Sequence, residues 1–320
     1  MAHKRVLIVA NKNWKATALM NVLLEPKACP DKFPWPVKLA HPVPPGTDWN
    51  NPQPRAVFHF DESPQGRDSE VRVEVWCIQD AMDPSVSSSS TKEKMRVLPK
   101  FFIRHGDKEV TADLVVAFGT AGFPSEASYN GCVVVGASAF IHNPFEKNTD
   151  SDSYWHSDAT DRLLLPSPRA ADLFNTHTNI FNETLKGQVE SRFTVPPMNP
   201  ASKQGLLAGS QYTAVGVVNI TNYDDYVWAD EAAHRRFEAT HEASQGTVRI
   251  GSLETTHGIV RLQSEAPFIF VSGITDRIGH FNEDVGLRSY AQNFACAHNA
   301  GVATAWLIPQ VVKFLSLEGA

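Results

Sequence analysis

Residues 250–278 read IGSLETTHGIVRLQSEAPFIFVSGITDRI, and this stretch decides the fold that we expect for the chain. An apolar helical run opens at Glu254, and an apolar strand over residues 268–272 leads to Asp276. In open α/β sheets, ligands bind beyond the carboxyl ends of the strands, so two acids at such an edge are candidates for chemistry. The alternative is that both are solvated loop residues, since most carboxylates are exposed.

The composition gives no sign of a nucleic-acid-binding or membrane protein. The chain of 320 residues has a formal net charge of −6, which gives no reason to expect nucleic acid or an anionic membrane as a partner. No apolar run is long enough to cross a bilayer, and the first residues, MAHKRVLIVANK, predict a strand and not a signal peptide. The four cysteines are scattered with no CxxC pair. We therefore expect a cytoplasmic, reduced protein with no metal and no cofactor.

Apolar runs rich in β-branched residues predict the other strands. Buried strands are expected at residues 5–10, 114–118, 132–136 and 213–218. Two further strands, which a hairpin would join, are expected at residues 57–60 and 71–78. The small residues Gly119–Gly122 predict a turn where backbone N–H groups approach a ligand closely.

Helical patterns alternate with these strands. Asn13 can cap a first helix over about residues 14–24, and Ser90 with Glu93 can form a capping box for another. Later helices are expected at about residues 229–243 and 285–315, the last with a break near Gly301.

Two stretches interrupt the alternation. Prolines forbid regular structure over about residues 26–56. A polar stretch over about residues 144–210, with one or two helices near 170–185, has too little apolar content for its own core. We therefore expect one α/β domain over residues 1–320, with a mixed, twisted central sheet flanked by helices and these two large insertions.

Three motifs resemble those of a known family. Residues 113–143 read DLVVAFGTAGFPSEASYNGCVVVGASAFIHN, and Ser252–Thr255 and Ile274–Asp276 follow in the same order as in that family. Together they resemble the nucleoside phosphorylase superfamily, which includes purine nucleoside phosphorylases and methylthioadenosine/adenosylhomocysteine nucleosidases. The resemblance covers the first strand, residues 113–143 and residues 212–308, and it implies a nucleoside phosphorylase-like fold.

The resemblance implies a catalytic role for each acid. Members of the family cleave an N-glycosidic bond through a ribose with oxocarbenium character. Glu254 would accept hydrogen bonds from the ribose 2′- and 3′-hydroxyls and place charge near the developing cation. Asp276 would protonate or hydrogen-bond N7 of the departing purine.

The resemblance also implies substrate-binding residues around the two acids. Leu253 replaces the usual methionine and would pack on the sugar, and residues 221–226 match the position of the base-stacking loop. His280 either reaches the site or caps its own loop. The implied set is Gly119, Thr120, Asn222, Tyr223, Tyr226, Leu253 and His280.

The nucleophile side departs from the family. Purine nucleoside phosphorylases commonly carry a phosphate-binding arginine at the position of Ala117, so Lys15, Arg104 or Arg277 would have to replace it. Hydrolytic members use a glutamate just after the first strand, whereas residues 11–15 (NKNWK) hold no acid.

Hydrolytic cleavage of the N-glycosidic bond of a purine nucleoside or related nucleotide is the resulting prediction. Two alternatives remain: a purine nucleoside phosphorylase that takes phosphate as co-substrate, and a non-catalytic nucleoside-binding or sensing protein. The expected partner is a small molecule, not nucleic acid or a membrane. The resemblance also implies a homo-oligomer, a dimer or larger.

Two other patterns are weaker. Gly136–Phe140 (GASAF) nearly matches the nucleophile elbow G-x-S-x-G but lacks its last glycine. His234 and His241 share a helix face, yet no acid or cysteine completes a zinc set.

Overall fold

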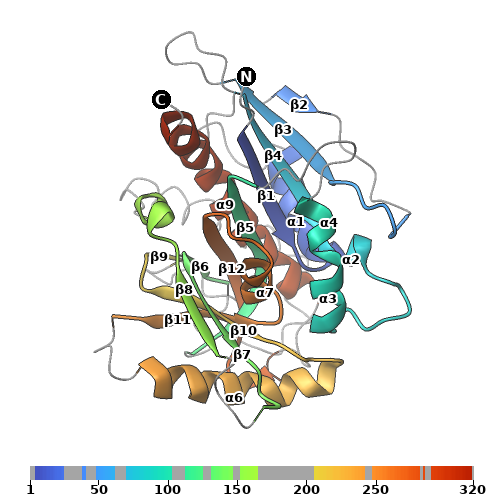
Figure 1. Ribbon diagram of the computed structural model, residues 1–320, viewed down its shortest axis with the longest axis vertical. Helices are drawn as coiled ribbons and strands as arrows, with labels where there is room; N and C mark the ends of the chain where they lie inside the picture. Colours follow the sequence, from blue (N-terminus) through green and yellow to red (C-terminus); the bar gives the residue numbers. More distant parts are fainter. Residues whose placement is uncertain are drawn as a thin grey trace.

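The computed structural model shows a mixed β-sheet with helices on both faces, which confirms the predicted fold class (Figure 1). It describes residues 4–24, 38–40, 48–61, 70–102, 112–124, 131–146, 152–164, 205–241, 247–281, 284 and 290–318. The strands are β1 (Lys4–Ala10), β2 (Lys38–Ala40), β3 (Ala56–Asp61), β4 (Glu70–Cys77), β5 (Leu114–Phe123), β6 (Val133–Gly136), β7 (Ser138–His142), β8 (Ser153–His156), β9 (Leu206–Ala208), β10 (Tyr212–Val217), β11 (Arg249–Glu254) and β12 (Phe268–Arg277). The helices are α1 (Asn13–Leu24), α2 (Ile78–Ala81), α3 (Thr91–Val97), α4 (Pro99–Phe102), the 3-10 helix η3 (Asp158–Leu164), α6 (Tyr223–His241), α7 (His257–Leu262) and α9 (Tyr290–Glu318).

The first strand shows why the chain folds as a layered sheet. β1 lies between β4 and β5 and is parallel to both. Val6 and Ile8 point into one core cluster, and Leu7 and Val9 point into the other. A strand that is buried on both faces reads as a continuous apolar run, so RVLIVA is typical of a central parallel strand.

A ring of strand pairings surrounds the carboxyl-terminal half of β5. β5 pairs with β12 on one side and with β11 on the other. β11 pairs with β10, β10 with β7, and β6 with β12. Since only Ala137 separates β6 from β7, these pairings close on themselves. The closure places the last residues of β11 and β12 on either side of β5.

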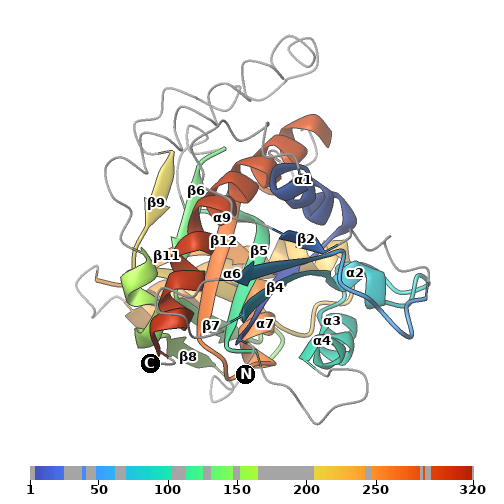
Figure 2. The ribbon, with the colours of Figure 1, turned by 90° about the horizontal axis from the view of Figure 1, so that it is seen from above.

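Helices cover the two faces of the sheet with separate cores. α1 and α9 lie together on one face, where they pack in the first cluster (Figure 2). α3, α4 and α7 contribute to the second cluster on the other face. α6 covers β7, β10 and β11 through a third, smaller cluster. In the described residues, no helix has the length and apolarity that a membrane crossing requires.

Three local predictions were wrong. Gly119–Gly122 is not a turn, because β5 stays paired with β12 as far as Phe123. The last helix has no break at Gly301, where the missing side chain lets α1 approach: a Cβ there would lie 3.0 Å from Val22 Cγ2. Within the proline-rich passage, Lys38–Ala40 forms the edge strand β2, antiparallel to β3.

Two boundaries near the predicted site also moved. Glu254 ends a strand instead of opening a helix, because β11 stays paired with β10 up to that residue. α6 begins at Tyr223 and not at residue 229, so Tyr223 and Tyr226 both lie on this helix. The reason is local capping: Asn222 Oδ1 accepts from Asp225 N (2.9 Å), and Asp225 Oδ2 accepts from Thr221 N (2.9 Å).

The polar insertion is partly within the described residues. β8 pairs with β7 and β9 pairs with β6, so both add to the central sheet. The helices predicted near residues 170–185 lie outside the described residues. The extent of the two insertions stays a prediction.

Candidate active site

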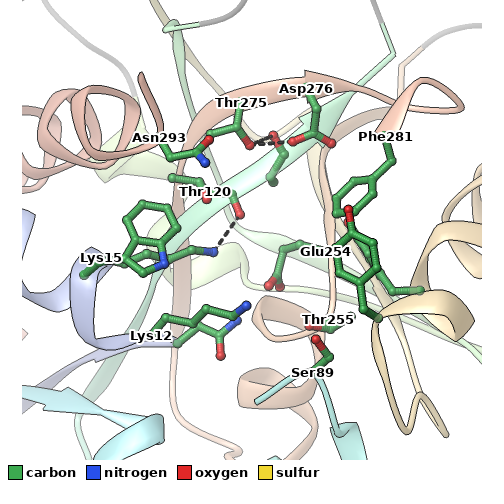
Figure 3. A pocket seen from close by; sticks show the side chains of 15 residues that line it. Lys12, Lys15, Ser89, Thr120, Glu254, Thr255, Thr275, Asp276, Phe281 and Asn293 are labelled. Atoms are coloured by element: carbon green, nitrogen blue, oxygen red, sulfur yellow. Dashed lines mark hydrogen bonds between the residues drawn. The ribbon is translucent and has the colours of Figure 1, made fainter. Parts of the chain in front are cut away.

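A cavity of about 220 Å³ opens where β5, β11 and β12 end (Figure 3). Glu254 and Asp276 both lie on its wall, together with residues from the loop after β1, from α1 and from α6. The lining residues are Asn11, Lys12, Trp14, Lys15, Ser89, Thr120, Ala121, Tyr223, Tyr226, Glu254, Thr255, Thr275, Asp276, Phe281 and Asn293.

The pairing of three strands brings the two acids together. Gly122 of β5 pairs with Leu253 of β11 on one side and with Asp276 of β12 on the other. An irregularity in the β12 register between Ile274 and Asp276 re-aims the end of that strand. Acids that are 22 positions apart in sequence therefore face one cavity.

Glu254 is held by the backbone that follows it. Its Oε1 accepts hydrogen bonds from Thr256 N (2.6 Å) and from His257 N, at the start of α7. Burial by itself raises the pKa of Glu254, but His257, Lys15 and Lys94 outweigh it and lower the pKa below its ordinary value. The carboxylate is therefore ionised at neutral pH although it is 4% exposed.

Asp276 depends on the absence of a side chain opposite it. Thr275 Oγ1 donates to Asp276 Oδ1 (2.5 Å), and Asp276 is 3% exposed. A Cβ at Gly122 would lie only 2.9 Å from Asp276 Oδ2, so the carboxylate occupies space that only glycine leaves open. This close approach is a reason for glycine near the end of β5.

Lysines form the wall opposite the aromatic residues (Figure 3). Lys15 Nζ donates to Thr120 O (3.2 Å). Burial lowers the pKa of Lys15 to about 8, although Glu254 works in the opposite direction. Burial also lowers the pKa of Lys12. Both cations lie where desolvation makes positive charge costly, so this wall favours an anion or a strong hydrogen-bond acceptor.

A buried ion pair fixes the segment that carries these lysines. Arg55 donates to both carboxylate oxygens of Asp80 at 2.7 Å and to Asn13 Oδ1 at 2.7 Å. Asn13 lies between Lys12 and Lys15 at the start of α1. A bidentate guanidinium–carboxylate pair holds its geometry well, so the lysine wall has a rigid support.

Aromatic side chains form the remaining wall. The rings of Tyr226 and Phe281 meet edge to face with centroids 4.8 Å apart, and those of Tyr223 and Phe281 lie 5.1 Å apart. Tyr226 is fixed by its hydroxyl, which donates to Leu253 O (3.3 Å). Flat apolar faces beside two acids suit a planar ligand such as a nucleobase.

Five residues of the predicted set lie on the cavity wall, and four do not. Those on the wall are Glu254, Asp276, Thr120, Tyr223 and Tyr226. Leu253 points away into the third core cluster, because alternation along β11 turns it opposite to Glu254. Gly119 is buried behind the wall, where a Cβ would lie 3.1 Å from His257 Nε2.

Asn222 and His280 do not line the cavity. The Asn222 side chain is spent on capping α6 through Asp225 N. His280 is exposed in the turn after β12, and its neighbour Phe281 faces the cavity instead. The turn requires Gly279 with φ +78°, which sets the direction of the residues that follow.

The residues considered for the nucleophile side lie in different places. Ala117 is fully buried in the second core cluster and does not line the cavity. Arg277 is paired with Asp284 (2.9 Å), and Arg104 lies outside the described residues. Lys15 is the one of the three substitutes that the structure places on the cavity wall.

Several wall residues escaped sequence reasoning. Ser89, Phe281 and Asn293 come from a loop, the segment after the Gly279 turn and α9, and no spacing in the sequence links them to the acids. Thr255 and Thr275 each adjoin a predicted acid, and that adjacency was an available signal.

The other candidate constellations lie elsewhere. Ser138 is fully buried and its Oγ lies 2.6 Å from His156 Nδ1, so it is no exposed nucleophile. His156, Asp158 and Asp161 are the group that could hold a metal within the described residues, and they belong to β8 and η3, not to the cavity. His241 packs on Phe140 and Phe237.

Comparisons with known proteins give a fold likeness only. No family model and no curated protein matches the chain. Among solved structures, a 5′-methylthioadenosine/S-adenosylhomocysteine nucleosidase from Helicobacter pylori is 9% identical with a TM-score of 0.47, over 97% of this chain and 100% of that one. An Arabidopsis thaliana 5′-methylthioadenosine nucleosidase is 13% identical with a TM-score of 0.46, over 96% of each chain. Futalosine hydrolase of Helicobacter pylori is 9% identical with a TM-score of 0.46, over 96% and 98%. At such scores we draw no functional conclusion from them.

Proposed function

We propose that this protein cleaves the N-glycosidic bond of a purine nucleoside or related nucleotide, with water as the nucleophile. The observation that carries the proposal is one cavity where Glu254 and Asp276 flank β5 beside the Tyr226–Phe281 wall. Sugar, base and leaving-group chemistry each find a matching group there.

The two acids suit different parts of one reaction. Glu254 is ionised, so it can accept strong hydrogen bonds from ribose hydroxyls and stabilise the positive charge that develops on the sugar. Asp276 can donate a proton to the departing purine nitrogen, since a purine leaves more readily in its neutral form. Tyr223, Tyr226 and Phe281 can pack on the faces of the base.

Asn11 supports hydrolysis. It lines the cavity in the segment just after β1, is 4% exposed, and its Oδ1 has no hydrogen-bond partner within the described residues. A buried acceptor without a partner is costly, and a water molecule in the cavity would satisfy it. In this proposal the Asn11 amide positions the attacking water, and Ala117 leaves no arginine for phosphate.

Phosphorolysis is the second candidate, and the lysine wall is the observation that favours it. Lys12 and Lys15 both line the cavity, and burial lowers the pKa of each. A phosphate anion would offset the cost of burying both ammonium groups. Phosphate could therefore act as co-substrate without the arginine that is missing at Ala117.

Base release from a panel of purine nucleosides and 5′-nucleotides, with and without phosphate, tests both candidates. Release in phosphate-free buffer supports hydrolysis, with free ribose as the other product from a nucleoside and ribose 5-phosphate from a 5′-nucleotide. Release only with phosphate, with ribose 1-phosphate as product, makes the protein a phosphorylase. Glu254→Gln and Asp276→Asn are the matched controls for contaminating enzymes, because base release by a contaminant would not fall with either substitution.

The non-catalytic alternative has its own signature. A binding or sensing protein would give calorimetric binding of a nucleoside without any base release. We further infer a homo-oligomer, a dimer or larger, because Tyr223 at the cavity wall is 42% exposed and suits cover by a second copy. The cytoplasmic location is proposed on the scattered cysteines alone. Light scattering after size exclusion tests the oligomer, and a monomer would remove that inference.

A further inference from the structure

Lys94 is a buried lysine close to the candidate site, which the sequence did not indicate. This lysine of α3 is fully buried. Its Nζ lies 2.5 Å from Thr255 Oγ1, 3.3 Å from Thr256 Oγ1 and 3.4 Å from Thr255 O. In the described part of the chain, all hydrogen bonds of its ammonium group go to these uncharged oxygens. A buried ammonium without a directly paired carboxylate is costly, so a purpose for it is expected.

The oxygens that Lys94 bonds belong to the segment that holds Glu254. Thr255 and Thr256 directly follow Glu254 in the chain. Glu254 Oε1 accepts from Thr256 N (2.6 Å) and from His257 N. Lys94 thus fixes the peptide units whose N–H groups orient the carboxylate, from behind the cavity wall.

The helix that carries Lys94 is fixed on its other side to the aromatic wall. Thr91 N donates to Ile220 O (2.8 Å), and Ile220 N donates to Thr91 Oγ1 (2.8 Å). Ile220 lies just before α6, which presents Tyr223 and Tyr226 to the cavity. α3 therefore connects the sugar side of the cavity with the base side.

We propose that Lys94 is a positioning residue, which holds the Glu254 carboxylate ionised and pointed at the sugar of the substrate. This role rests on the proposed function, whereas the contacts of Lys94 with Thr255 and Thr256 do not depend on it. Lys94 does not line the cavity, so it acts through Thr255, Thr256 and Glu254 without touching the ligand.

The charges around Glu254 give the direction of the effect. Lys15 faces it from α1, His257 from α7 and Lys94 from α3, and together they lower its pKa against the effect of burial. Burial lowers the pKa of Lys94 itself to about 7, with Lys12 and Lys15 adding to the effect and Glu254 opposing it. Tyr226, from α6, also faces Glu254: burial raises the pKa of Tyr226, and the charge of Glu254 adds to that rise. Removal of the Lys94 charge must therefore raise the pKa of Glu254.

The first experiment compares Lys94→Met and Lys94→Gln with the unmodified protein. We expect kcat/KM at pH 7 to fall roughly tenfold and the acid limb of its pH profile to move up by roughly 0.5–1 unit, as expected for loss of one nearby charge. Lys94→Gln keeps a hydrogen bond to the threonines without the charge. Its rate should therefore exceed that of Lys94→Met, whereas its pH profile should be shifted as much as that of Lys94→Met. Lys92→Met, at an exposed position of the same helix, is the matched control and should change neither.

A carboxyl titration separates this inference from the proposed function. In protein with ¹³C-labelled glutamate, the Glu254 signal, assigned by its loss in Glu254→Gln, should titrate at higher pH in both Lys94 variants. If the unmodified protein releases no base from any nucleoside but the Lys94 variants show this shift, the proposed function is refuted and the inference stands. An unchanged Glu254 titration overturns the inference whatever the activity.

A double-mutant cycle and a second site complete the test. Lys94→Met should cost less than about twofold in a Glu254→Gln background, because the interaction is already lost. An equal loss in both backgrounds would show a merely structural role. If neither Lys94 variant folds, Thr255→Val removes the shortest contact and keeps the charge. It should lower kcat/KM and leave the Glu254 titration nearly unchanged, and an unaltered rate would contradict the positioning role.

Discussion

The acid side and the lysine side of the cavity differ in how well their residues match the motifs of the nucleoside phosphorylase superfamily. The acid side, at the ends of β11 and β12, holds Glu254 and Asp276 at positions that the short motifs indicate. The lysine side, at residues 11–15, holds Lys12, Lys15 and the Asn11 amide. None of these residues is the glutamate that the resemblance implies at residues 11–15, and none replaces the arginine at Ala117 by type. In the proposed reaction, the acid side selects the bond that is broken and the lysine side selects the nucleophile that attacks.

Asp276→Asn tests the acid side and should have the largest effect. Loss of a general acid lowers kcat/KM by roughly 10²–10⁴-fold. The measurement is base release from the best nucleoside of the panel. Glu231→Gln, an exposed carboxylate on α6, is the control and should leave the rate unchanged. A rate for Asp276→Asn within twofold of the unmodified protein would remove the general-acid assignment.

Gly122→Ala asks how tightly the acid side is packed. The new Cβ would lie 2.9 Å from Asp276 Oδ2 and must displace that carboxylate, so we expect kcat/KM to fall by roughly 10²-fold. Gly279→Ala is the matched control, since nothing lies within 4 Å of a Cβ there. Its φ of +78° makes alanine cost about 1 kcal/mol of stability instead. Equal losses of activity in both variants would contradict the close-packing explanation.

Lys15→Met tests the lysine side. A charge-assisted hydrogen bond to the nucleophile or to substrate oxygens contributes about 1.5–3 kcal/mol, so kcat/KM should fall by roughly 10–100-fold. The pKa of Lys15 is about 8, so its charge is present below that pH and lost above it. The unmodified protein should therefore lose activity as pH rises through about 8, and Lys15→Met should lack this decline. A decline that persists in the variant assigns it to another group.

Asp230→Asn should have the smallest effect, and on stability instead of rate. Asp230 Oδ2 accepts from Gly279 N (3.4 Å), below the turn that carries Phe281, and its Oδ1 has no partner within the described residues. Burial raises the pKa of Asp230 to about 6 from 3.8. The neutral form therefore favours the folded state, and stability falls as pH rises from about 4 to 6.

The substitution removes that pH-dependent loss. We expect Asp230→Asn to raise the free energy of unfolding by about 1–2 kcal/mol at pH 8 and to change it little at pH 4. Urea unfolding at both pH values is the measurement. A gain at pH 4 equal to that at pH 8 would show that ionisation of Asp230 is not the cause.

Much of the fold and part of the site were predictable from local pattern. The run RVLIVA, the strand at residues 268–272 and the capping Ser90 can each be recognised from neighbours a few positions away. The bounds of β5 and α6 were missed because pairing with β12 and the cap at Asn222 decided them. Leu253 was misplaced because its side of β11 follows from strand alternation, which a helical interpretation of that segment had hidden.

The sequence by itself determined the α/β class, the central strands and the two acids, because periodicity and short motifs are local properties. Only the tertiary structure decided which residues meet those acids. Lys15 and Asn11 reach the cavity because β1 lies beside β5, and Phe281 because a turn at Gly279 directs it inward. Lys94 is buried behind Glu254 because α3 packs against α7. Such meetings depend on strand order and helix packing, which no short stretch of sequence contains.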